Sequence, residues 1–202
     1  MGQRSQIYVR IKNKGKTDLI AKYFQWNYAE RMISRARYGI EWIKENLEYL
    51  DWEDKKRDLK RILEVNFDMK DVMSSVNLVE EYNQWIEKYD DKNESMNNSD
   101  GFKEFVFISV DNNDGKLFVD VDIEKKTVKF CLTDDELNIL PPKDYMNWDY
   151  EDWQSSEYLS DDGRKACQEN IKYLENVEQL SDEDLQDFIN YDYWLDMNKP
   201  SF

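Results

Sequence analysis

The stretch that decides the fold is QIYVRIKNKGKTDLIAKYFQW, residues 6–26. At its start, Ile7, Val9 and Ile11 alternate with more polar residues, which is the two-residue period of a half-buried strand. The polar turn NKGK leads into a second strand, so the chain is expected to open with a β-hairpin. Apolar residues then recur at three- and four-residue steps over about residues 29–50. This spacing predicts a long amphipathic helix after the hairpin.

Helical and strand patterns also divide the rest of the chain. Helical periods cover residues 52–63, 71–89, 164–179 and 182–192, and Ser181 with Asp184 three residues later is typical of a helix cap. FVFISVD, the turn NNDG and KLFVDVDI predict a second hairpin, and TVKFCLT predicts the next strand. The core side of this hairpin is expected to carry Val106, Ile108, Val110, Leu117, Val119, Val121 and Ile123. Together these patterns predict a single α+β domain, with an antiparallel sheet of about five strands packed with helices.

Within this single domain, residues 1–202, the parts differ in composition. We expect a basic N-terminal hairpin and helix at 1–61, a helical part at 62–89, a mobile loop at 90–101, strands at 102–133, and an acidic aromatic loop with C-terminal helices at 134–202. Mobility is predicted for 90–101 because its polar residues bury nothing that would offset the entropy of ordering them.

Composition restricts the chemistry and the location of the protein. With 202 residues, 40% of them hydrophobic, the chain can build one substantial core. Histidine is absent, which removes the commonest general base and most zinc sites. No apolar run approaches a membrane span, no secretory signal precedes the domain, and Gln6 stands where a myristoylation signal needs Ser or Thr. We therefore expect a cytoplasmic protein whose Cys131 and Cys167 are ordinary buried thiols.

The charge of −16 is unevenly distributed. Residues 1–61 contain 15 Lys and Arg against 9 Asp and Glu, whereas the remainder contains 13 against 35. From Asp134 onward the balance is 5 basic against 19 acidic side chains. An asymmetry of this size concerns the binding partners of a protein and not its fold.

The first candidate binding surface is YMNWDYEDWQSSEYLSDD, residues 145–162, where aromatic and acidic residues alternate without a helical or strand period. Carboxylates on a rigid frame can imitate the closely spaced phosphates of DNA, with aromatic side chains as anchors. The alternative is a solvated acidic loop whose aromatics pack onto the domain. The predicted partner-binding residues are Asp149, Glu151, Asp152, Trp148, Trp153, Tyr150, Asp161 and Asp162.

The second candidate surface lies on the predicted helix at 29–50. At 100° per residue, Arg31, Arg35, Tyr38 and Trp42 share one face that is separate from the apolar stripe. Arginine and aromatic residues are frequent at nucleic-acid contacts and at interface hot spots, so the alternative hypothesis is that this face, with Lys12, Lys14 and Lys16, binds nucleic acid or an acidic partner. Alternatively, the arginines pair with carboxylates of this same chain.

Metal-dependent catalysis is the third hypothesis. DNNDGK, residues 111–116, fails the register of a calcium loop, and Asp111 and Glu124 lie too far apart in the predicted hairpin to share a metal. Glu104, Asp120 and Asp122 remain as a carboxylate cluster for a metal-dependent nuclease. We rank this last, and expect no catalytic residue, no metal and no cofactor.

The opening IYVRI…LIAKYFQWNYAERMISRARYGIEW resembles small acidic proteins carried by phages and mobile elements. In size, acidity and composition the chain is also similar to anti-CRISPR proteins, phage inhibitors of CRISPR effectors. The resemblance implies an inhibitor that acts by protein–protein interaction, with DNA mimicry as one mode of action, and it transfers no site residues. We therefore expect a non-enzymatic protein that binds a basic nucleic-acid-handling partner such as a CRISPR effector, with no membrane contact and no direct nucleic-acid binding.

Overall fold

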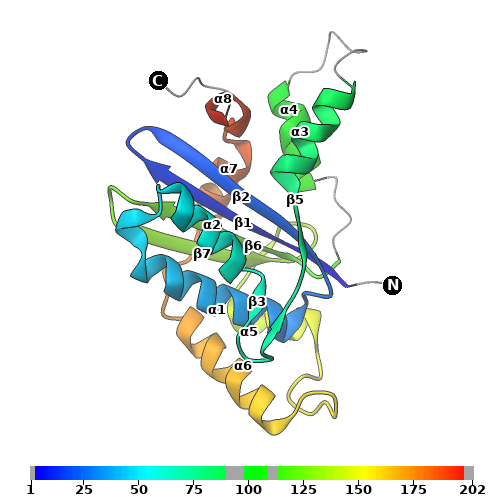
Figure 1. Ribbon diagram of the computed structural model, residues 1–202. Coiled ribbons are helices and arrows are strands. Elements are labelled where there is room, and N and C mark those ends of the chain that lie inside the picture. The colour runs from blue at the N-terminus through cyan, green and yellow to red at the C-terminus, as the bar shows by residue number, and fades with distance from the viewer. Residues whose placement is uncertain (1–2, 90–97, 109–112, 198–202) are drawn as a thin grey trace.

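A six-stranded sheet lies at the centre of the computed structural model, which describes residues 3–89, 98–108 and 113–197 (Figure 1). The strand order is β5-β2-β1-β6-β7-β8, and β1 and β6 run parallel while the other neighbours are antiparallel. The strands are β1 (Arg4–Asn13), β2 (Lys16–Gln25), β5 (Ser75–Asn77), β6 (Lys116–Asp122), β7 (Thr127–Thr133) and β8 (Ile139–Leu140). A separate pair consists of β3 (Val65–Asn66) and β4 (Asp71–Val72).

Helices cover both faces of this sheet (Figure 1). The first face packs against α1 (Ala29–Glu45), η1 (Leu47–Tyr49), α2 (Glu53–Ile62), α5 (Pro142–Asp149) and α6 (Asp161–Leu174). The second face packs against α3 (Leu78–Tyr89), α4 (Asn98–Lys103), the π-helical turn η2 (Glu104–Ile108), α7 (Asp182–Asn190) and α8 (Tyr193–Met197). The protein is therefore a single α+β domain with two hydrophobic cores, one on each side of the sheet.

The opening hairpin builds both cores because successive side chains of a strand point to opposite faces. Ile7 and Val9 belong to the core under α1, whereas Tyr8 belongs to the aromatic core on the other side. The parallel pairing places Val9 beside Val119 of β6. The predicted hairpin and its membership of the same sheet as the later strands are confirmed, although the sheet is mixed and has six strands.

The predicted strand FVFISVD is wrong over its described residues. Residues 104–108 form η2, and residues 109–112 lie outside the described part. Val106 and Phe107 are both buried in the aromatic core. Adjacent strand residues would point to opposite faces, whereas a helical turn allows both side chains to reach the same core. Of the predicted core side, Leu117, Val119 and Val121 do share one core, while Val106 lies in the other.

Three further segments differ from the sequence prediction. The predicted helix at 71–89 begins only at Leu78, because residues 75–77 pair with β2 at the edge of the sheet. In the loop predicted at 90–101, residues 98–101 belong to α4 and 90–97 lie outside the described part. The segment from Pro142 forms α5, which no apolar period had indicated, and proline suits the first turn because it lacks a backbone donor.

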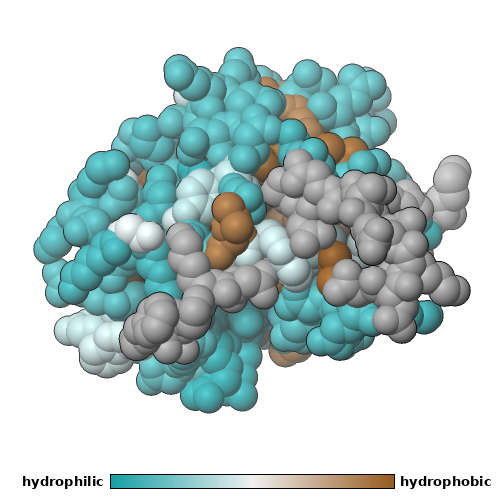
Figure 2. Space-filling model, turned by 90° about the horizontal axis from the view of Figure 1, so that it is seen from above, coloured by the Kyte–Doolittle hydropathy of each residue, from teal (hydrophilic) through white to brown (hydrophobic). Residues whose placement is uncertain are grey.

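Several local predictions are confirmed. α2 lies within the predicted 52–63, and α7 begins with the capping box of Ser181 and Asp184. Cys131 and Cys167 are free and buried. No helix in the described part of the chain is both long and apolar enough to cross a bilayer. Viewed from above, most of the surface is hydrophilic, with hydrophobic atoms emerging in only a few places (Figure 2).

Candidate functional site

The acidic loop, defined as residues 150–162, connects α5 to the first turn of α6 and runs at the lower right of the molecule (Figure 1). Among the residues that the structure describes, Asp161 is the only carboxylate of this loop in an ion pair, with Arg164. The other carboxylates of the loop are therefore available to a partner. The exposed carboxylates of the loop are Glu151, Asp152, Glu157, Asp161 and Asp162.

Asp149, predicted as a partner contact, instead connects three parts of the fold. Its Oδ2 accepts a hydrogen bond from the backbone N–H of Ala29, at 2.5 Å, and another from the Tyr145 hydroxyl, at 3.3 Å. It also shares a hydrogen bond with the carboxyl group of Asp114. Asp114 accepts in turn from the backbone N–H of Arg4. The pair thus joins the end of α5, the start of α1 and the segment before β6.

A carboxyl pair of this kind holds a proton more tightly than an isolated carboxyl group. Burial, together with the neighbouring Asp114, raises the pKa of Asp149 to about 8, although the N–H of Ala29 opposes the shift. Burial likewise raises the pKa of Asp114. Two carboxylates in contact cannot both ionise without repulsion, so the pair retains a proton near neutral pH. The pair therefore carries one negative charge and not two, so Asp149 contributes less surface charge than the sequence predicted.

The aromatic residues of this region divide into core and surface. Trp153 is 1% exposed, and its indole N–H donates to Asn147 Oδ1, at 3.0 Å. Tyr150 is half-buried and its hydroxyl contacts Ser156. By contrast, Trp148 is 39% and Tyr158 97% exposed. The expected role of Trp153 as a surface anchor is wrong because its ring lies in the core, whereas Trp148 remains accessible.

The predicted arginine and aromatic face of α1 is largely covered by the chain that follows α2. Arg35 is 1% exposed and donates to the carbonyl oxygens of Leu63, at 3.0 Å, and Glu64, at 3.3 Å, and to Asn27 Oδ1, at 2.7 Å. Its guanidinium also lies over the ring of Phe24. Burial lowers the pKa of Arg35 to about 10. The expectation that Arg35 lies on an open binding face is wrong.

The other members of that face also contact the domain. Arg31 lies 3.7 Å from the carboxylate of Asp71, and the Tyr38 hydroxyl donates to Asp68 Oδ1, at 3.1 Å. Trp42 is partly buried against the first core. Internal pairing, the alternative that the sequence left open, therefore describes this face.

Of the three carboxylates of the nuclease hypothesis, Asp120 and Asp122 are already neutralised, while Glu104 is exposed in η2. Asp120 forms a bidentate pair with Arg10, at 2.8 and 2.9 Å, and accepts from Lys12, at 2.8 Å. Although burial raises the pKa of Asp120, these hydrogen bonds and charges outweigh it and hold the pKa below its ordinary value. Asp122 pairs with Lys125, at 3.1 Å. In the described part of the chain, no three carboxylate or thiol side chains converge in a way that could hold a metal ion.

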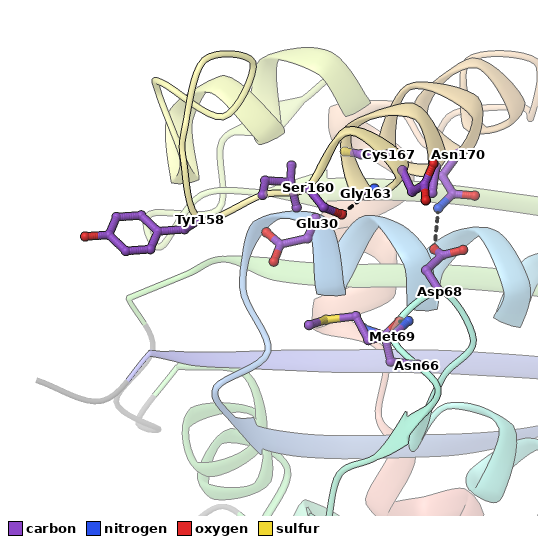
Figure 3. Close-up of a pocket in the computed structure, with 12 residues that line it drawn as sticks. Glu30, Asn66, Asp68, Met69, Tyr158, Ser160, Gly163, Cys167 and Asn170 are labelled. Atoms are coloured by element: carbon purple, nitrogen blue, oxygen red, sulfur yellow. Dashed lines mark hydrogen bonds between the residues drawn. The ribbon is translucent and has the colours of Figure 1, made fainter.

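A cleft of about 500 Å³ opens beside the acidic loop (Figure 3). Three elements form its walls: the first turn of α1 with Glu30, the β3–β4 connection, and the start of α6 (Figure 3). Tyr158 and Asp162 extend the wall into the acidic loop. The cleft therefore joins the acidic surface to the interior of the domain. The remaining lining residues are Asn66, Asp68, Met69, Leu159, Ser160, Gly163, Ala166, Cys167 and Asn170.

Two polar atoms of this cleft are buried without a partner among the described residues: Glu30 Oε2 and Asn66 Nδ2. Asn66 is 1% exposed, and its Oδ1 accepts from the backbone N–H of Met69, at 3.1 Å, and from the Ser34 hydroxyl, at 3.2 Å. Asp68, in contrast, accepts from Tyr38 and from Asn170 Nδ2, at 2.7 Å. A buried polar atom without a hydrogen bond costs free energy, so a ligand that reached Glu30 Oε2 and Asn66 Nδ2 would remove that cost.

The chemistry of the cleft favours binding over catalysis. Burial raises the pKa of Cys167 to about 12, so its thiol stays protonated and is a poor nucleophile at neutral pH. Burial also raises the pKa of Glu30. The Ser160 hydroxyl caps α6 by accepting from the backbone N–H of Gly163, at 3.1 Å. The neighbouring carboxylates of Glu30 and Asp68 raise the pKa of the thiol further, so they do not favour its thiolate form.

Sequence reasoning missed this cleft because its walls come from segments far apart in the chain. Glu30 is in the same stretch as the arginine face, but nothing in its spacing distinguishes it from a surface glutamate. Asn66 and Asp68 lie between the predicted helices at 52–63 and 71–89, where no element was predicted. The one available signal was Ser160 before Asp161 and Asp162, a pattern typical of a helix start.

Comparison with known proteins identifies no relative. No family model matches the chain, and neither the curated proteins nor the solved structures contain a match. The assignment of function therefore depends on the surfaces described above.

Proposed function

We propose that this protein is a non-enzymatic inhibitor that binds a basic, nucleic-acid-handling protein through its acidic loop. The observation that carries the proposal is the exposure of Glu151, Asp152 and Glu157, none of which forms an ion pair within the described part of the chain. Carboxylates without an internal cation keep their full charge available to a basic groove. An inhibitor of the anti-CRISPR kind, acting as a partial nucleic-acid mimic, would use such a surface.

Support also comes from the frame behind the loop. Trp153 is buried in the first core and Asp149 joins α5 to α1, so the first end of the loop is attached to the rigid part of the domain. Towards its other end, Arg164 of α6 donates to the carbonyl oxygen of Ser156, at 2.8 Å. Trp148 and Tyr158 supply exposed aromatic rings beside the carboxylates. Exposed aromatics surrounded by charge are typical of interface anchors, with the charges steering association.

Capture of partners from a host lysate, with identification by mass spectrometry, is the first test. Binding to the captured basic protein should weaken steeply as the salt concentration rises. At physiological ionic strength, exposed charges that lie more than about 8 Å apart are already largely screened from each other. The triple variant Glu151→Gln, Asp152→Asn, Glu157→Gln should slow association, and Trp148→Ala should speed dissociation.

The matched control is Glu136→Gln, Asp182→Asn, Glu183→Gln, which removes the same number of exposed carboxylates from outside the acidic loop, none of them in an ion pair within the described part of the chain. If both triple variants slow association equally, net charge and not the acidic loop drives binding. An unchanged association rate for the loop variant would refute the proposal.

A further inference from the structure

The cleft between α1, the β3–β4 connection and the start of α6 contains carboxylates but no lysine or arginine among its described lining residues. Glu30, Asp68 and Asp162 are its ionisable carboxyl groups. The N-terminal end of a helix attracts anions, but Asp161 and Asp162 in the first turn of α6 offset that dipole. A cation is therefore the charge that this cleft accommodates best.

The unpartnered buried atoms specify the ligand further. Glu30 Oε2 needs a donor, and Asn66 Nδ2, in a residue that is 1% exposed, needs an acceptor. The assignment of the Asn66 amide follows from its Oδ1, which accepts from the N–H of Met69. A purely cationic ligand would satisfy Glu30 and leave Asn66 unpaired. A ligand that carries both a cationic donor and a carbonyl oxygen would satisfy both atoms.

The walls suit a flat cation on an apolar stem. Met69 and Leu159 line the cleft, whereas the Tyr158 side chain points away from the other lining residues (Figure 3). The methylene stem of arginine packs against apolar side chains. The volume of about 500 Å³ accommodates one long side chain with part of its backbone.

We infer that this cleft binds an arginine residue of the protein partner, with the guanidinium at Glu30 and a peptide carbonyl accepting from Asn66. This inference rests on the proposed function, because it supplies the basic partner with a specific anchor beside the acidic loop. Arginine matches the site better than lysine because its planar group donates several hydrogen bonds at once. The loop carboxylates would steer the partner, and the cleft would hold one of its side chains.

The test uses the full-length protein and a small probe, Nα-acetyl-arginine N-methylamide, in an NMR titration that follows backbone amide shifts of Met69 and Gly163. The isosteric neutral probe, Nα-acetyl-citrulline N-methylamide, controls for charge. We expect saturable shifts for the arginine probe and a loss of about tenfold or more in affinity for the citrulline probe, since bonds to charged groups contribute most. Equal affinity for both probes would contradict the inference.

Two near-isosteric variants test the two unpartnered atoms. Glu30→Gln should weaken the arginine probe by about tenfold or more, whereas Glu151→Gln, an exposed change outside the cleft lining, should leave it unchanged. Asn66→Asp removes the donor and retains the acceptor for Met69. It should abolish the preference for the arginine probe over agmatine, which has a guanidinium but no carbonyl oxygen.

Thermal melts verify that each variant is folded before its binding is interpreted. If Glu30→Gln binds the arginine probe as well as the wild type does, the inference is refuted. That result leaves the proposed function intact, because the latter is tested by the acidic-loop variants against a captured partner. Conversely, probe binding without any captured partner would support the cleft and refute the inhibitor proposal.

Discussion

Replacing Asp149 by Asn should make the stability of this protein less dependent on pH. In the folded state the pKa of Asp149 is raised to about 8, mainly by burial and by Asp114, whereas in the unfolded chain it returns to about 3.8. The folded protein therefore holds a proton that the unfolded chain releases. Stability from this group is fully present below about pH 4 and is lost as pH rises towards the folded pKa.

The size of the effect follows from the difference between the pKa of Asp149 in the folded protein and its pKa in the unfolded chain. Each pH unit between the two pKa values changes the free energy of unfolding by about 1.4 kcal/mol, with the slope levelling off near the folded pKa. Between about pH 6 and pH 8 the wild type should lose about 2 kcal/mol from this pair, an upper value because Asp149 is only half-buried. For a domain of this size that is a fall of about 4–8 °C in Tm.

In Asp149→Asn the amide oxygen can still accept from the N–H of Ala29, and the amide N–H can donate to Asp114. Urea unfolding at a series of pH values should therefore give a flatter profile for this variant. The control is Asp152→Asn, which removes one formal charge from an exposed position of the acidic loop. Parallel profiles for the wild type and Asp149→Asn would refute the assignment of a protonated carboxyl pair.

Three other substitutions test the frame of the domain. Arg35→Met should reduce the free energy of unfolding by about 3–5 kcal/mol, because it leaves buried acceptors at Leu63 and Asn27 unpaired. A loss below about 1 kcal/mol in urea unfolding would contradict the burial of this arginine. Gly115→Ala should cost about 3 kcal/mol or more, because Gly115 has a φ of 77° and an added Cβ would lie 2.2 Å from the carbonyl oxygen of Thr133. A soluble variant with unchanged Tm would refute that steric argument. Ser181→Ala should cost about 1 kcal/mol through loss of the α7 cap, and a matched Ser155→Ala change at an exposed site should cost almost nothing in the same thermal melts.

Local patterns predicted the elements that have a clear turn or a clear cap. The hairpin at 6–26 follows from its alternation and turn, and α7 follows from Ser181 and Asp184. Where both faces of a strand are buried, the alternation of apolar and polar residues no longer shows which side chains face the core. β6 shows this, since Val119 faces one core while Phe118 faces the other.

The errors arose where tertiary contacts override a local pattern. Arg35 is buried because it donates hydrogen bonds to the backbone carbonyl oxygens of residues 63–64. A helical wheel considers only the residues of one helix and so could not predict these contacts. The parallel pairing of β1 with β6 joins segments more than 100 residues apart, so the turn chemistry around residues 111–115 could not reveal it. The same long separation explains why Asp120 was taken for a metal ligand when Arg10 already neutralises it.

The carboxyl pair and the acidic loop have opposite electrostatic roles although they are adjacent in sequence. Asp149 is held by Ala29 and Asp114 and keeps a proton, so it adds little charge to the surface near neutral pH. Glu151 and Asp152, only two and three residues later, are exposed and form no ion pair within the described residues. A partner therefore meets charges that are carried on a hydrogen-bonded anchor whose two carboxyl groups share one proton. Because the loop is already held in place, binding costs little conformational entropy. Substitutions of the loop carboxylates should therefore change the association rate, whereas substitutions of Asp149 should change the stability of the fold.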